Sequence, residues 1–199
     1  MGHVMSFVVF EGIDGSGTTT MANRLAEYLK NSTFHCEPTD AYIGRFIRSV
    51  LRKEMSMGNV ELGLLFVADR IQHSRQIAEE LTAKKTVVCD RYSGSTYAYQ
   101  NRSFPLKFLQ EVCFQPPFVI KPDLVIYLDA SIETSEARRA QRSGNPERFE
   151  DRETQQMVAE AYIRFLEDAP TFGWNVRVVD ANQDIETVWT EIRKLFWLH

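Results

Sequence analysis

The residues best suited to chemistry lie in a glycine-rich stretch near the N-terminus. Gly12 and Gly17 have the spacing of a Walker A phosphate-binding loop, and Thr19 fills the position whose hydroxyl binds Mg²⁺. A Walker A loop also carries a lysine, but Thr18 stands at that position here. Backbone N–H groups and a helix N-terminus can still bind phosphate, so we expect a nucleotide site that lacks its usual cation. The residues expected to bind the nucleotide are Gly12, Ile13, Asp14, Gly15, Ser16, Gly17, Thr18, Thr19 and Thr20.

A second chemical feature is the pair Asp90-Arg91, which follows the apolar run 86–89. A buried strand here would deliver both side chains to the edge of a sheet where the glycine loop also lies. Asp90 can reach Mg²⁺ through water, and Arg91 can bridge the two phosphates between which a phosphoryl group passes. The alternative is an ordinary surface ion pair. Beside a phosphate loop we favour a catalytic role, with Thr19 and Asp90 as the metal-binding residues.

Arginines are concentrated around the turn-rich segment 143–146. Such a cluster is often only a solvated helix face. Near bound phosphates, arginines on a flexible loop can instead close as a lid and neutralise the transferring charge. We expect a lid over about residues 138–152, in which Arg142 and Arg148 act in catalysis. The cluster also contains Arg138, Arg139 and Arg152.

Phe66 and Arg70 lie four residues apart in a helical pattern. At this spacing they share one face of the helix, where a ring and a guanidinium can stack on and hydrogen-bond a flat base. An aromatic residue at helical spacing is also often part of the core. The two residues alone leave both alternatives open.

The elements that must position these residues alternate between short β-rich runs and longer helical patterns. This alternation predicts an α/β fold with a parallel sheet covered by helices on both faces. The expected strands are Ser6–Glu11, Thr33–Glu37, Thr86–Asp90, Leu124–Asp129 and Val176–Asp180. The expected helices are Thr19–Asn31, Ile43–Glu54, Glu61–Lys84, Leu106–Phe114, Ile132–Arg142, Arg152–Leu166 and Ile185–Phe196. Because each strand ends in a carboxylate, we also expect an acidic rim that handles Mg²⁺ or polar ligands.

Length and composition favour a single domain over residues 1–199, with 44% hydrophobic residues available for a core. The net charge of −4 argues against a nucleic-acid partner, which needs a clustered basic face. No apolar run approaches the roughly 18 residues of a membrane span. Three widely spaced cysteines are typical of free thiols in a reducing compartment, so we expect a cytoplasmic protein.

Together these residues resemble the thymidylate kinase family over essentially the whole chain. The matching segments are Glu11–Thr20, Glu37-Pro38, Phe66 with Arg70, Asp90–Tyr92, Ser95–Gln100, Lys121–Leu124, Tyr127–Asp129 and Arg148–Glu150. The resemblance implies a P-loop, nucleoside-monophosphate-kinase-like fold of three layers, with a five-stranded parallel sheet and a short lid. It also implies transfer of the γ-phosphoryl group of ATP to dTMP with Mg²⁺, and a homodimer formed through the helices near residues 61–80.

The resemblance further implies individual roles. Asp14 would hydrogen-bond the 3′-hydroxyl of the deoxyribose, and Arg91 would hold the acceptor phosphate. Phe66 would stack on thymine while Arg70 bonds its carbonyl edge, and Tyr99 would crowd any 2′-hydroxyl. The other residues expected to bind the substrate are Glu37, Pro38, Ser95 and Thr96. Gly15 stands where some members have an arginine, so catalytic help is expected from the lid, as in the bacterial-type subgroup.

Two positions depart from the family pattern. Cys36 stands where many members have an arginine that contacts phosphate, and Thr18 brings no charge to the loop. A lost transition-state donor can cost about 10²–10³ in rate. Either Arg91 and the lid arginines compensate, or the protein binds nucleotide with little turnover; a kinase for another deoxynucleoside monophosphate is a further alternative. Because Asp90 and Arg91 are retained, we favour an active dTMP kinase.

Overall fold

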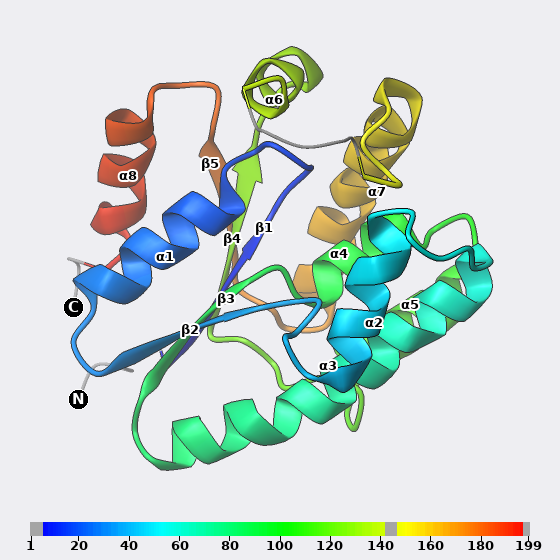
Figure 1. Ribbon diagram of the computed structural model, residues 1–199. Helices are drawn as coiled ribbons and strands as arrows, with labels where there is room; N and C mark the ends of the chain where they lie inside the picture. Colours follow the sequence, from blue (N-terminus) through cyan, green and yellow to red (C-terminus); the bar gives the residue numbers. More distant parts are fainter. Residues whose placement is uncertain (1–5, 142–146, 197–199) are drawn as a thin grey trace.

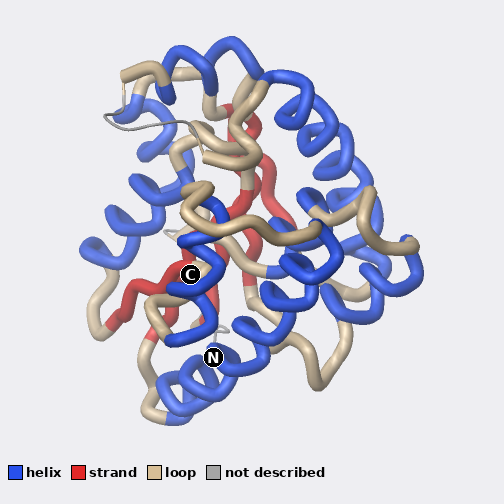
Figure 2. The backbone as a smooth tube through the Cα atoms, turned by 45° about the vertical axis from the view of Figure 1, so that its right-hand side comes forward, coloured by secondary structure: helices blue, strands red, loops and turns tan. Residues whose placement is uncertain are grey.

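The computed structural model of the protein describes residues 6–141 and 147–196. In this part of the chain, five parallel strands form one sheet in the order β2-β3-β1-β4-β5. The strands are β1 Phe7–Glu11, β2 Ser32–Cys36, β3 Thr86–Asp90, β4 Leu124–Asp129 and β5 Val176–Asp180. The helices are α1 Thr18–Tyr28, α2 Tyr42–Leu51, α3 Asn59–Thr82, α4 Ser93–Tyr99, α5 Leu106–Phe114, α6 Ile132–Arg139, α7 Arg152–Thr171 and α8 Ile185–Lys194. Helices enclose the sheet (Figures 1 and 2), which confirms the predicted three-layer fold.

The central strand β1 divides the core into two layers. Val8 and Phe10 pack with residues of α1 and α8 on one face, whereas Phe7 and Val9 pack with residues of α3, α4, α5 and α7 on the other. Figure 1 shows the same division, with α1 and α8 on one side of the sheet and α4 and α7 on the other. All of β1 is buried, so the loop that follows it starts from a rigid support.

The strand order reverses at β1, which pairs with β3 on one side and with β4 on the other. Ligands in sheets of this kind bind where the order reverses, at the carboxyl ends of the strands. The register pairs Phe10 with Asp90, so the end of β3 lies beside the end of β1. The topology therefore brings the glycine loop and Asp90-Arg91 to one place.

The bounds of β3, β4, β5 and α5 agree with prediction, and the other elements differ at their ends or were not expected. The helix α4 was missed because seven residues are too few to show a helical period. The helix α1 ends at Tyr28 rather than Asn31, which takes a left-handed φ of 57°. The helix α7 runs five residues past its predicted end at Leu166, because Ala169 still packs into the core.

Two further sequence-based expectations concern the thiols and the membrane. All three cysteines are free, with Cys89 and Cys113 buried and Cys36 half-buried. Among the helices of the described residues, none combines the length and the hydropathy that a bilayer crossing requires.

Candidate active site

The turn from Gly12 to Gly17 connects β1 to α1. Gly15 and Gly17 have φ angles of +91° and +101°, a left-handed backbone that residues with a Cβ rarely adopt. Gly17 is the N-cap of α1, and no described side chain caps the helix. The N–H groups of its first turn have no partner within the helix and are free to bind a ligand. The local geometry is that of a phosphate loop.

The loop opens into a cavity of about 710 Å³, a size typical of small-molecule sites. Most of the residues predicted from the sequence line it. They are Asp14, Gly15, Gly17, Thr18, Thr19, Thr20, Glu37, Pro38, Phe66, Arg70, Asp90, Arg91, Ser95, Thr96 and Tyr99. Gly12, Ile13 and Ser16 do not line the cavity, and the Ile13 side chain belongs to the core.

Thr19 and Asp90 form the most direct contact between the two predicted motifs. The Thr19 hydroxyl donates a hydrogen bond of 2.5 Å to Oδ2 of Asp90. Oδ1 of Asp90 is buried and has no hydrogen-bond partner among the described residues. A hydroxyl and a carboxylate with a free oxygen are ligands of the hard type that Mg²⁺ takes. The residues present therefore fit a magnesium site.

The Arg91 side chain is fixed between the glycine loop and α4. Its Nη2 lies 2.6 Å from Oδ1 of Asp14, and its Nη1 donates to the Gly12 carbonyl at 2.8 Å and to Oγ of Ser95 at 3.2 Å. Asp14 is held in turn by Gln155, whose Oε1 accepts from the Asp14 N–H at 3.0 Å. Gln155 on α7 is fully buried and was not predicted, because it belongs to none of the motifs. The guanidinium of Arg91 is thus oriented before any ligand binds.

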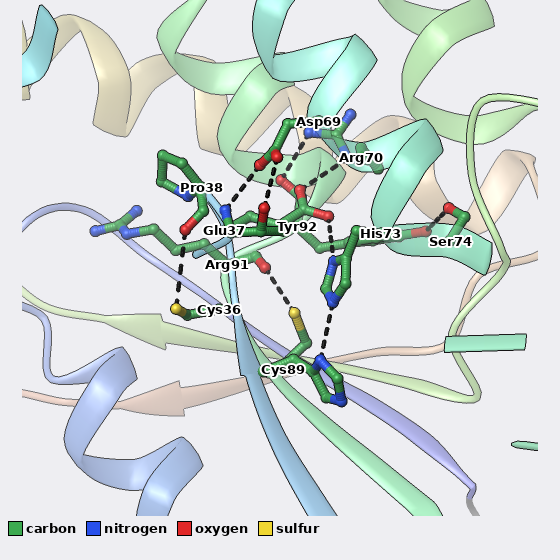
Figure 3. Close-up of polar contacts among 12 residues, drawn as sticks. Cys36, Glu37, Pro38, Asp69, Arg70, His73, Ser74, Cys89, Arg91 and Tyr92 are labelled. Atoms are coloured by element: carbon green, nitrogen blue, oxygen red, sulfur yellow. Dashed lines mark hydrogen bonds and ion pairs between the residues drawn. The ribbon is translucent and has the colours of Figure 1, made fainter. Parts of the chain in front are cut away.

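The Arg70 guanidinium marks another side of the cavity. It is 1% exposed; its Nε donates to Oε2 of Glu37 at 3.1 Å and its Nη2 donates to the Thr96 hydroxyl. Its Nη1 is buried with no partner in the described part of the chain. Phe66 from the same helix and Gln100 from the end of α4 line the cavity beside it. Figure 3 shows Arg70 and Glu37 side by side. Because Phe66 and Arg70 both line the cavity, the predicted aromatic-arginine pair belongs to it.

The arginines of the predicted lid divide into two groups. Arg139 lines the cavity and donates to the Asp14 carbonyl and, at 2.6 Å, to the Ser135 hydroxyl. Arg148 does not line it and donates instead to Oδ1 of Asn59 at 2.8 Å. Arg142 lies outside the described residues. The cluster was recognised from the sequence, but among its described arginines the one that lines the cavity is Arg139, to which no catalytic role had been given.

Arg48 of α2 is a further cavity residue that the sequence motifs missed. Its Nη2 lies 3.1 Å from Sγ of Cys36, the residue that replaces an arginine of the family pattern. Burial raises the pKa of the Cys36 thiol, and the positive charge of Arg48 opposes that rise. The structure therefore places a guanidinium from a different element beside the departure at Cys36.

Most of the strand-end carboxylates do not form the predicted acidic rim around the cavity. Glu11 is fully buried and accepts hydrogen bonds from the Tyr92 N–H at 2.9 Å and from the Ser95 hydroxyl at 2.7 Å. Burial raises the pKa of Glu11, although these contacts and Arg91 oppose the rise. Asp129 and Asp180 do not line the cavity. Glu37, which directly follows β2, and Asp90 do line it. Glu11 instead supports the start of α4, and the Asp180 carboxylate accepts from Asn182 and Gln183 in the following turn.

The strand order, the glycine loop at the reversal point and the adjoining Asp-Arg pair define a P-loop kinase of the nucleoside-monophosphate type. The family model for thymidylate kinase matches residues 10–192, and the chain belongs to this family of phosphotransferases.

The comparisons with individual proteins extend over nearly the whole chain. A probable thymidylate kinase of Methanococcus aeolicus is 39% identical over 192 residues, which cover 94% of each chain. A putative thymidylate kinase of Treponema pallidum is 36% identical over 191 residues, covering 92% of this chain and 90% of that relative. The structure of thymidylate kinase from Candida albicans is similar over 96% of this chain and 91% of the Candida chain, with a TM-score of 0.79 and 24% sequence identity. At that identity the last comparison shows the fold.

Proposed function

We propose that this chain transfers the γ-phosphoryl group of ATP to dTMP, giving dTDP. The observation that carries the proposal is the continuity of one cavity from the glycine loop, past Asp90 and Arg91, to the buried guanidinium of Arg70. A phosphate loop, an oriented arginine and an unused N–H donor for a base are the parts that such a transfer needs. Membership of the thymidylate kinase family supports the same assignment.

On the donor side, the N–H groups from Gly15 to Thr19 bind the phosphates of ATP at the N-terminus of α1. Thr19 and Asp90 would hold Mg²⁺, which would neutralise charge on the phosphate oxygens. Thr18 is 4% exposed and lines the cavity, so its hydroxyl is available for one hydrogen bond to a phosphate.

On the acceptor side, Arg91 holds the phosphate of dTMP. Arg91, Arg139 and Arg48 line the same cavity, and we infer that they supply the positive charge that a Walker A lysine would bring. Arg142 and Arg148 join them if the lid closes over bound phosphates. This distribution of charge explains how the chain can work with Thr18.

At the base end, Phe66 stacks on thymine and Nη1 of Arg70 donates to a thymine carbonyl. Asp14 bonds the 3′-hydroxyl, and Tyr99 leaves no room for a 2′-hydroxyl. Both polar atoms of the Gln100 amide are buried without a partner in the described chain, so we add this side chain as a contact for the base. Glu37, Pro38, Ser95 and Thr96 complete this part of the cavity wall.

We also propose a homodimer through the long helix α3. Val60 and Leu64 on this helix are 47% and 48% exposed, although they are large and apolar. Sedimentation of the wild type and of Leu64→Glu tests the assignment. A dimer that becomes a monomer in the variant supports it, whereas a monomeric wild type contradicts it.

The experiment that tests the proposed function is an assay of ADP release with ATP, Mg²⁺ and dTMP. We expect turnover that depends on all three, with dTDP as the product. ADP release at the same rate without dTMP, or no turnover while both nucleotides bind, would overturn the proposal.

A further inference from the structure

A line of hydrogen bonds runs from Arg70 away from the substrate cavity. Nδ1 of His73 lies 2.9 Å from Oε1 of Glu37, and Nε2 of His73 lies 3.0 Å from Nδ1 of His35. Nε2 of His35 lies 2.8 Å from Oε2 of Glu80. Glu37 and His73 are 7% and 3% exposed. Figure 3 shows His73 on the side of Glu37 away from Arg70, so the carboxylate is held from both sides.

The direction of two hydrogen bonds in this line follows from their acceptors, because an ionised carboxylate can only accept. His73 therefore donates to Glu37, and His35 donates to Glu80.

The surroundings of Glu80 support this direction. The Thr33 hydroxyl also donates to Glu80. Burial opposes the ionisation of Glu80, but the hydrogen bonds from Thr33 and His35 together hold its pKa below the ordinary value. Glu80 is therefore an acceptor at the far end of the line.

We propose that His73 is a positioning residue for the nucleobase: by donating to Glu37, it fixes the carboxylate that holds the Arg70 guanidinium toward the substrate cavity. The inference rests on the proposed role of Arg70 at the base. Without the donor from His73, Oε1 of Glu37 would be a buried acceptor with no partner. The Arg70 guanidinium is an available donor, and a second bond to Glu37 would turn it away from Thr96.

A second cavity, of about 550 Å³, is bordered by His35, His73 and Gln76.

The kinetic test compares His73→Phe with His73→Gln, in which an amide can still donate to Glu37. We expect His73→Phe to raise the KM for dTMP about tenfold, the value of one hydrogen bond to a charged group. Its kcat and its KM for ATP should stay within about twofold of wild type. His73→Gln should recover most of the lost affinity. Gln76→Leu is the control, since Gln76 borders the second cavity without bonding Glu37.

Other outcomes are informative in different ways. A wild type that does not phosphorylate dTMP contradicts the proposed function. A working wild type with an unchanged KM in His73→Phe, or with kcat and the KM for ATP equally damaged, contradicts the positioning role. A folded His73→Gln in which the KM for dTMP is raised tenfold or more would overturn the inference even if His73→Phe does not fold, because its amide can still donate to Glu37.

The direction of the hydrogen bond itself is tested by ¹⁵N NMR of the imidazole nitrogens, which is practical because the chain has four histidines. We expect Nδ1 of His73 to carry a proton. A His73 ring whose Nδ1 is unprotonated would contradict the inference, whatever the kinetics show.

Discussion

The hydroxyl of Thr19 and the carboxylate of Asp90 lie 2.5 Å apart, although 71 residues separate them in the sequence. The contact exists because β3 pairs with β1, so that the end of one strand lies beside the loop that follows the other. One oxygen of Asp90 remains without a partner among the described residues. The fold thus brings together two side chains of the kind that bind a hard cation, before any nucleotide binds.

Removal of the negative charge at Asp90 should therefore weaken metal-dependent turnover. We expect Asp90→Asn to lower kcat by about 10²–10³, the usual effect of losing a preorganised electrostatic contact. Raising the Mg²⁺ concentration should recover part of the loss. Asp129→Asn is the matched control, since Asp129 ends the neighbouring strand β4, is exposed and does not line the cavity. Equal kcat values for wild type and Asp90→Asn across a Mg²⁺ titration would contradict the metal site.

Base selectivity should follow from the free Nη1 of Arg70. A thymine carbonyl accepts its hydrogen bond, whereas the amino group of cytosine would leave it buried and unpaired. A site built on such a bond can discriminate by about 10⁴. We expect kcat/KM for dTMP to exceed the values for dCMP, dGMP and dAMP by a large factor. Equal rates with dTMP and dCMP would rule out this assignment of the pocket.

The lid arginines should act on the rate rather than on dTMP binding. Arg139→Ala should lower kcat by about tenfold to a hundredfold and leave the KM for dTMP within about threefold. The same direction is expected for Arg142→Ala and Arg148→Ala if the lid closes during turnover. Arg152→Ala is the control, because Arg152 pairs with Glu133 and Glu136. Unchanged kcat in the first three variants would show that these arginines belong only to a solvated helix face and take no part in catalysis.

Acid should destabilise the fold through Glu80. Burial opposes ionisation, yet the hydrogen bonds from Thr33 and His35 keep the folded-state pKa below its ordinary value of 4.5. The folded state therefore binds this proton less readily than the unfolded chain does, and the stabilisation is present above about pH 4.5 and lost as pH falls through the lowered pKa. Urea unfolding between pH 3 and 6 should show a smaller loss of stability on acidification in Glu80→Gln. The neighbouring variant Glu79→Gln should keep the wild-type slope.

How much could be predicted from the sequence depended on whether a local pattern carried the information. The glycine loop, Asp90-Arg91 and the strand-helix alternation were recognised because each is a short pattern with a direct structural meaning. Gln155 and Arg48 were missed, since their roles arise only when α7 and α2 pack beside the loop. Glu11 was misplaced at an acidic rim, because a strand-end carboxylate that faces the interior looks the same in sequence. Arg139 was recognised as part of a cluster, but which arginine enters the cavity depends on where α6 ends.

The central claim is that arginines lining the cavity supply the charge that is absent at Thr18. A lysine installed there would enter a cavity already lined by Arg91 and Arg139, and like charges at close range disfavour one another.

The most direct test is steady-state kinetics of wild type and Thr18→Lys with dTMP at saturating ATP and Mg²⁺. We expect a wild type that turns over, and a variant whose kcat is lower or is raised by less than about tenfold. A rescue of about a hundredfold or more would show that the lysine restores a missing transition-state donor, and would contradict the claim.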